Sequence, residues 1–189
     1  MMKQNIFPAI KLTIVCIIFF MGIYPLFIWG IAQAAPKNGK GETVSVNGKV
    51  AGYKLEGQNF TDDKYFYSRP SAVNYNAAGS AGSNKGPTNP DYLKTVADRI
   101  DTFLVHNPGT KKEDIPSELV TASGSGLDPD LSPAAAYIQA KRIAQIRNIP
   151  EQQLNNLIAK NIQQPLLGLF GTAHVNVLQL NIQLDEIKQ

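Results

Sequence analysis

The chain has 189 residues, of which 43% are hydrophobic and 17% are charged, and its formal net charge is +3. This apolar fraction argues against a disordered chain, and the length suggests about one domain. With 18 basic and 15 acidic side chains, the charge is too balanced for a phosphate-binding surface, so no nucleic-acid partner is expected. The single cysteine, Cys16, excludes a disulfide scaffold.

An uncharged apolar segment runs from Leu12 to Pro36. As a helix it would be roughly 37 Å long, enough to cross the ~30 Å hydrocarbon core of a bilayer and so to contact membrane lipid. We therefore expect a cytoplasmic N-terminus over residues 1–11, a transmembrane helix over residues 12–35 and an extracytoplasmic domain over residues 36–189.

The orientation of this helix is only weakly encoded. Two lysines precede the segment and two follow it, so the positive-inside rule is tied, and the expected orientation rests on the likeness of its small-residue exit to export signals. A cleaved signal peptide ending at Ala34 is an alternative, and it would release a secreted binding protein. A lipoprotein anchored at Cys16 is a further alternative, although Val15 does not suit its processing.

Small residues recur on one face of the apolar helix. Gly22, Leu26 and Gly30 are spaced by four residues, and the two glycines would let another helix approach closely. Pro25 is expected to kink the helix.

The rest of the chain predicts a small mixed α/β domain of short strands and about three helices. Asn47-Gly48 between alternating apolar residues predicts a hairpin over residues 43–55, and Phe60 with Tyr65–Tyr67 forms a second β-prone patch. Helices are predicted to begin at Asn89-Pro90, at Ser132-Pro133 and at Pro150-Glu151, each with a capping residue or an N1 proline.

Two features of this domain are irregular. After Val175 and Val177 the apolar positions change parity, so either a bulge lies near 177–178 or a strand hands over to a short helix. The segments 71–90 and 121–133 are rich in Gly, Ser and Asn and too long for simple connections. Such loops are frequently functional, and we expect them to be contact surfaces.

No catalytic or metal-binding constellation is visible in the sequence. His106 and His174 are the only histidines and neither has a partner at metal-ligand spacing, so no metal site is expected. Ser123 and Ser125 lack the preceding glycine of a nucleophile elbow. These residues alone indicate an anchored domain with a binding or accessory role, with an anchored extracytoplasmic enzyme as the alternative.

Several longer motifs resemble one family. In chain order they are Gly22-x-Tyr24-Pro25-Leu26, Gly57-Gln58-Asn59-Phe60-Thr61, Tyr65-Phe66-x-x-Arg69-Pro70-Ser71-Ala72, Gly82-Ser83-Asn84, Pro116-x-Glu118-Leu119-Val120-Thr121-Ala122-Ser123-x-Ser125-Gly126-Leu127-Asp128, Gln163-Gln164-Pro165-Leu166 and Val175-Asn176-Val177-Leu178-x-Leu180-Asn181-x-x-Leu184-Asp185. Together they resemble the C subunit of the Kdp potassium-transporting ATPase over nearly the whole chain.

The resemblance implies a non-catalytic subunit of a bacterial inner-membrane complex. Its partners would be a channel-like potassium-binding subunit, a P-type ATPase subunit and a small membrane subunit. The chain would need no cofactor of its own, since ATP and potassium are handled by the complex. The family is described as a catalytic chaperone that aids assembly and raises the ATP affinity of the pump subunit.

The same resemblance suggests site residues. Gln163 and Gln164 form the family's proposed nucleotide contact, although a domain outside the membrane would not meet cytoplasmic ATP, so a structural role at the end of a helix is preferred. The candidate partner contacts, taken from the motifs and loops above, are Gly22, Pro25, Gly30, Asn59, Arg69, Ser83, Asn84, Ser123, Ser125 and Asp128.

Overall fold

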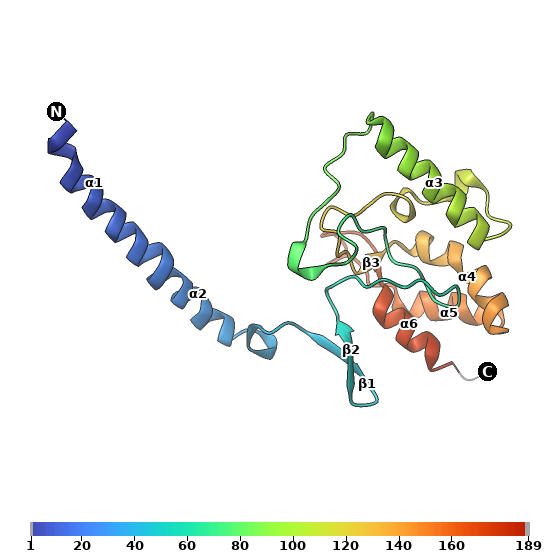
Figure 1. The fold of residues 1–189 in the computed structure, drawn as a ribbon. Helices are drawn as coiled ribbons and strands as arrows, with labels where there is room; N and C mark the ends of the chain where they lie inside the picture. Colours follow the sequence, from blue (N-terminus) through green and yellow to red (C-terminus); the bar gives the residue numbers. More distant parts are fainter. Residues whose placement is uncertain (1, 188–189) are drawn as a thin grey trace. The chain divides into compact units, whose positions relative to one another are not determined.

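The computed structural model describes residues 2–187, without the side chains of residues 2–4 and 36, and the chain divides into two compact units. The first unit ends at Glu42 and the second begins at Thr43. Figure 1 shows a helical N-terminal unit and a mixed α/β unit, which confirms the predicted fold class.

The N-terminal unit is one long helical run. Helix α1 (Met2–Ile17) continues through a π-helical stretch (Ile18–Ile23) into α2 (Tyr24–Gln33). Within the part of the chain that the structure describes, Asn5–Gln33 is the one helix long and apolar enough to cross a membrane, with a mean hydropathy of 2.4 in its most apolar window. None of that window is buried against the rest of the chain, so its apolar surface is free for lipid or another helix.

The π-helical stretch explains how Pro25 is accommodated. Proline has no N–H to donate to the carbonyl four residues earlier, and its ring crowds that carbonyl. Here Tyr24 N donates to Phe19 O, a five-residue step that widens the turn just before the proline. The helix therefore continues past Pro25 through a wide turn, where we expected a kink.

The second unit begins with the predicted hairpin. Strand β1 (Thr43–Val46) pairs antiparallel with β2 (Lys49–Tyr53). The turn residues Asn47 and Gly48 have φ values of 50° and 77°, the left-handed conformation that a tight two-residue hairpin turn requires at both positions.

The described part of the second unit continues with four α-helices: α3 (Pro90–His106), α4 (Pro133–Arg147), α5 (Glu151–Asn161) and α6 (Val177–Asp185). The expected starts are confirmed, since Asn89 and Ser132 accept hydrogen bonds from the third backbone amide that follows each of them. Helices α4, α5 and α6 pack side by side, and most of the apolar core lies between them (Figure 1).

The change of parity near Val177 is the handover from strand to helix, the second of the two alternatives. Strand β4 (Val175–Asn176) pairs with β3 (Asp130–Leu131) for two residues. Asn176 then caps α6 by accepting a hydrogen bond from Gln179 N at 3.0 Å. Helix α6 therefore follows the three helices whose starts were predicted.

The predicted β-prone patch around Tyr65–Tyr67 is not a strand. Its backbone groups are bound by side-chain amides of distant helices, and no neighbouring strand pairs with it in the described chain. Asn181 in α6 accepts from Phe66 N at 2.9 Å and donates to Phe66 O at 3.0 Å. Gln139 in α4 accepts from Tyr67 N at 2.8 Å and donates to Tyr67 O at 3.4 Å. Two carboxamides thus replace a strand partner.

A buried arginine completes this arrangement. Arg142 in α4 is 3% exposed and donates hydrogen bonds to the carbonyl oxygens of Asp63 and Tyr65 and to Asn107 Oδ1. Its guanidinium also lies 4.2 Å from the centre of the Tyr67 ring. The segment 63–67 is therefore joined to α4 and to the end of α3.

Replacing the amide of Asn181 tests this pairing. The variant Asn181→Leu is expected to lose about 2–5 kcal/mol of unfolding free energy, because the amide and carbonyl of buried Phe66 would lose their partner. The measurement is chemical denaturation of the full chain in detergent, followed by circular dichroism. Asn156→Leu, at an exposed position on α5, is the control and should change stability by about 0.5 kcal/mol or less. Equal losses in the two variants would contradict the assignment.

Candidate functional site

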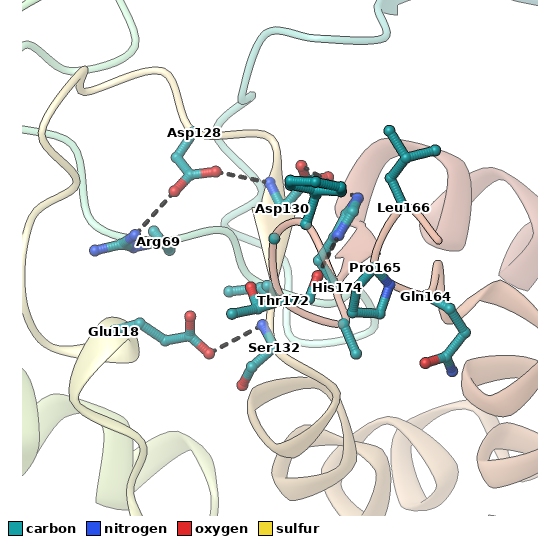
Figure 2. Close-up of a pocket in the computed structure, with 14 residues that line it drawn as sticks. Arg69, Glu118, Asp128, Asp130, Ser132, Gln164, Pro165, Leu166, Thr172 and His174 are labelled. Atoms are coloured by element: carbon teal, nitrogen blue, oxygen red, sulfur yellow. Dashed lines mark hydrogen bonds and ion pairs between the residues drawn. The ribbon is translucent and has the colours of Figure 1, made fainter. Parts of the chain in front are cut away.

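A pocket of about 630 Å³, called here the main pocket, lies beside the β3–β4 pair (Figure 2). Its walls come from four stretches that are distant in sequence. These are the segment around Arg69, the turn at Glu118, residues 128–132 and the segment 164–174. Arg69, Glu118 and two aspartates bring charged groups to the lining, and Pro165, Leu166 and Phe170 bring apolar ones.

An ion pair lies in the lining of the pocket. Arg69 Nη1 donates to Asp128 Oδ2 at 2.8 Å, and both side chains are about a quarter exposed, at 24% and 29%. The other oxygen of Asp128 accepts from Asp130 N at 3.1 Å (Figure 2). Both oxygens of this carboxylate are therefore used within the domain.

The backbone at Asp128 is held by a glycine. Gly57 N donates to Leu127 O at 2.7 Å, and a Cβ on Gly57 would lie 2.4 Å from Asp128 O. Only glycine fits this approach of two chain segments. The glycine of the Gly57-Gln58-Asn59 motif thus positions the acidic partner of Arg69.

Two further carboxylates line the pocket. Glu118 Oε1 accepts from Ser132 N at 3.0 Å, next to the start of α4. Asp130 Oδ1 accepts from Asn176 Nδ2 at 3.3 Å, and its Oδ2 lies 4.0 Å from His174 Nε2. Burial raises the pKa of the Asp130 carboxyl above its ordinary value, and the nearby His174 and the hydrogen bond from Asn176 offset only part of this effect.

The pocket does not contain an activated nucleophile. The Ser132 hydroxyl caps α4 by accepting from Ala135 N at 3.2 Å, and no hydrogen bond from it to a base is found among the described residues. His174 Nδ1 is bound to Thr172 O at 3.0 Å. Among residues 2–187, no group of three or more His, Cys, Asp and Glu side chains is placed to hold a metal ion. The arrangement is suited to binding a polar or charged group next to an apolar one.

The two long loops pack against each other. Ser80 Oγ donates to Ser125 O at 2.9 Å, and Ser71 Oγ donates to Gly126 O at 2.7 Å. Gly82 lies so close to Gly124 that a Cβ there would be 2.9 Å from its carbonyl oxygen. Segments 71–90 and 121–133 therefore form one connected surface.

The serines predicted in these loops serve different purposes. Ser123 is 3% exposed and its hydroxyl accepts from Gly126 N at 2.9 Å, so a direct partner contact does not fit its buried position. Ser125 is exposed, although its hydroxyl accepts from Leu127 N at 3.0 Å. Ser83 is partly exposed and lines a second pocket with Lys85 and Arg99, and Asn84 is exposed beside it.

The remaining candidates are spread over the chain. Arg69, Asp128 and Gln164 meet at the main pocket, whereas Gln163 does not line it. Gln163 instead pairs through its backbone with His174, at 2.8 and 3.1 Å. Asn59 is exposed on the segment after the hairpin.

The candidates in the N-terminal helix have room for a partner. A Cβ on Gly22 or Gly30 would meet nothing within 4 Å, so both positions are open to the approach of another helix. Pro25 lies one turn after Gly22, directly behind the widened π-helical stretch.

The structure also reveals a polar cluster that the sequence pattern did not indicate. The carboxylate of Asp63 accepts hydrogen bonds from the Tyr67 hydroxyl and from His106 Nδ1, the latter at 2.8 Å. Burial acts to raise the pKa of Asp63, but the hydrogen bonds from Tyr67 and His106 outweigh it and the pKa is lowered. Burial and the bond to Asp63 raise the pKa of Tyr67 to about 12. His106 is 43 residues away from Asp63 in the sequence, so no spacing rule would place it in this cluster.

A candidate membrane-spanning helix followed by a mixed α/β domain fits a membrane-anchored, single-pass protein. The family model described as KdpC, the c chain of the K⁺-transporting ATPase, matches residues 6–186. The chain therefore belongs to the KdpC family, as its motifs indicated.

Individual relatives support this assignment over their full length. A potassium-transporting ATPase KdpC subunit of Flavobacterium psychrophilum is 56% identical over 185 residues, which cover 98% of this chain and 100% of the relative. The same-named subunit of Bacteroides fragilis is 50% identical over 188 residues, 98% of both chains. That of Caldanaerobacter subterraneus subsp. tengcongensis is 45% identical over 190 residues, 100% of this chain and 98% of the relative.

Removing the charge of Asp130 and removing that of Asp128 should have opposite effects on the stability of the fold at pH 7. The folded-state pKa of Asp130 lies above its ordinary 3.8, so the stability linked to this group is full below pH 3.8 and falls as the pH rises through the folded-state value. Asp130→Asn should therefore be more stable than the original chain at pH 7, and the difference should shrink toward pH 4. Asp128→Asn should be less stable at pH 7, because Arg69 loses its partner.

Thermal unfolding of both variants in detergent, at several pH values, measures the two effects. Each variant is the control for the other, because both substitutions remove one negative charge from the same pocket. A loss of stability at pH 7 in Asp130→Asn as large as that in Asp128→Asn would contradict the prediction.

Proposed function

We propose that this chain is a non-catalytic accessory subunit of a potassium-transporting P-type ATPase complex. The observation that carries the proposal is the family match over residues 6–186, which includes both the apolar helix and the pocket-bearing domain. The unburied apolar surface of Asn5–Gln33 supports a role of this helix in the membrane, next to another helix or lipid.

The proposed topology has the N-terminus in the cytoplasm and the domain from residue 43 onward outside the membrane. The domain would lie over the potassium entrance of a channel-like subunit and assist assembly with the pump subunit and a small membrane subunit. The connected surface of loops 71–90 and 121–133, with Ser83, Asn84 and Ser125 accessible, is the proposed contact region.

In this proposal the subunit raises the ATP affinity of the pump indirectly. Gln163 supports an indirect role, because its backbone amide and carbonyl are both paired with His174 and hold the base of the following turn. Gln164 lies beside it at the pocket. ATP and potassium would be bound by the other subunits.

The ATP role is tested in the assembled complex. Replacing both glutamines, as Gln163→Ala/Gln164→Ala, is expected to leave the KM for ATP within roughly twofold of the original complex, because backbone pairing does not need these side chains. Omitting the whole chain should raise that KM or prevent assembly. A large rise in KM in a fully assembled double variant would support direct nucleotide contact and contradict the proposal.

The topology is tested by labelling single cysteines. In a Cys16→Ser background, Lys85→Cys should react with a membrane-impermeant maleimide in intact spheroplasts, because Lys85 is exposed on the domain. Asn5→Cys, on the other side of the apolar segment, should react only after lysis. The reverse pattern would contradict the proposed orientation.

A further inference from the structure

An apolar turn projects from the domain next to the main pocket. We call residues 165–171 the apolar hairpin. Its side chains Leu166, Leu167, Leu169 and Phe170 are 70%, 80%, 80% and 63% exposed. Four large apolar side chains together on a surface are characteristic of an interaction site, whereas single exposed apolar residues are ordinary.

The apolar hairpin is an ordered structure. Leu166 N donates to Phe170 O and Phe170 N donates to Leu166 O, both at 3.0 Å. Gly168 N also donates to Pro165 O at 2.9 Å, which closes the tip. Below the tip, the backbone pair of Gln163 and His174 joins the two ends of the turn.

The backbone at the tip of the apolar hairpin is strained, and the exposed side chain of Leu167 gains no buried contact that would offset this strain. Leu167 has a φ of 55°, in the left-handed region that disfavours a residue with a branched side chain. Such strain commonly marks a functional segment, here one that presents its leucines outward.

The charge around the apolar hairpin distinguishes between a membrane and a protein as its binding surface. Residues 161–187 contain no lysine or arginine. The adjoining pocket carries the carboxylates of Glu118, Asp128 and Asp130 against a single cation, Arg69, which is already paired (Figure 2). Segments that bind anionic lipid surfaces place lysine and arginine around their apolar residues, so this surface is unfavourable for a membrane.

We propose that the apolar hairpin docks the domain onto another subunit of the same potassium-transporting ATPase. The partner surface would have an apolar depression for the leucines and phenylalanine and a basic rim facing Asp130 and Glu118. This inference rests on the proposed function, because it takes the chain to be a subunit of a complex. It gives the segment after Gln163-Gln164 the role of an interaction element.

The test uses the full chain, tagged and co-expressed with the other subunits of its ATPase, and purified in mild detergent. Leu167→Ser/Leu169→Ser should lower the apparent affinity for the other subunits by about tenfold or more, the effect expected when central apolar contacts are removed. Leu55→Ser/Val105→Ser is the matched control, since these side chains are 71% and 77% exposed elsewhere on the domain. The control should co-purify like the original chain.

A cross-linking experiment keeps the inference testable if the serine variant folds poorly. A photoreactive amino acid at position 169 of the otherwise unchanged chain, in native membranes, should cross-link to another subunit. Cross-linking to lipid only, or no cross-link at all, would overturn the inference, as would unchanged co-purification of the serine variant.

The two proposals fail in different ways. If the original chain recovers its subunits but the hairpin makes no contact, only the docking inference fails. If the original chain recovers no subunit, the proposed function fails as well.

Discussion

The fold of the domain depends on how two residues of an isolated segment satisfy their backbone groups. Phe66 and Tyr67 have no strand beside them in the described chain, and the carboxamides of Asn181 and Gln139 bind their amides and carbonyls. Because Phe66 is fully buried, leaving these groups unpaired would be costly. The pairing joins α4 and α6 to a segment more than 70 residues away in sequence.

This constraint also positions the pocket. Arg69 lies two residues after Tyr67, so the amide pairing positions the backbone from which the guanidinium reaches Asp128. From the other side, the close approach of Gly57 to the backbone of Asp128 positions the carboxylate. The ion pair between Arg69 and Asp128 therefore forms only when both segments are packed in place. The pocket beside it depends on the same packing.

The sequence predicted the hairpin and the helix starts correctly, because residues close together in the chain stabilise them. Asn47-Gly48 predicted the hairpin because its turn needs two residues in the left-handed region, and Asn89 and Ser132 predicted helix starts because their side chains cap the first turn. The β-prone patch at Tyr65–Tyr67 is not a strand in the structure. Aromatic residues favour extended chain, but nothing nearby indicates that its partners are amides from helices.

The candidate site was predictable only in part. Arg69, Asp128 and Gln164 were identified from motifs, and the structure brings them to one pocket. Asp130, Glu118 and His174 line the same pocket through pairings that no spacing rule contains. The sequence also did not predict that Leu167 and Leu169 are exposed, because leucines close together in a sequence usually indicate a buried core.

The short connection between the two units lowers the affinity that the domain needs for a neighbouring protein. Between the end of α2 at Gln33 and the start of β1 at Thr43, the nine intervening residues can reach at most about 30 Å. If the helix is held in a complex, this tether keeps the domain at an effective concentration in the millimolar range near its neighbours. Individually weak contacts would then be occupied most of the time and could still open and close within a transport cycle.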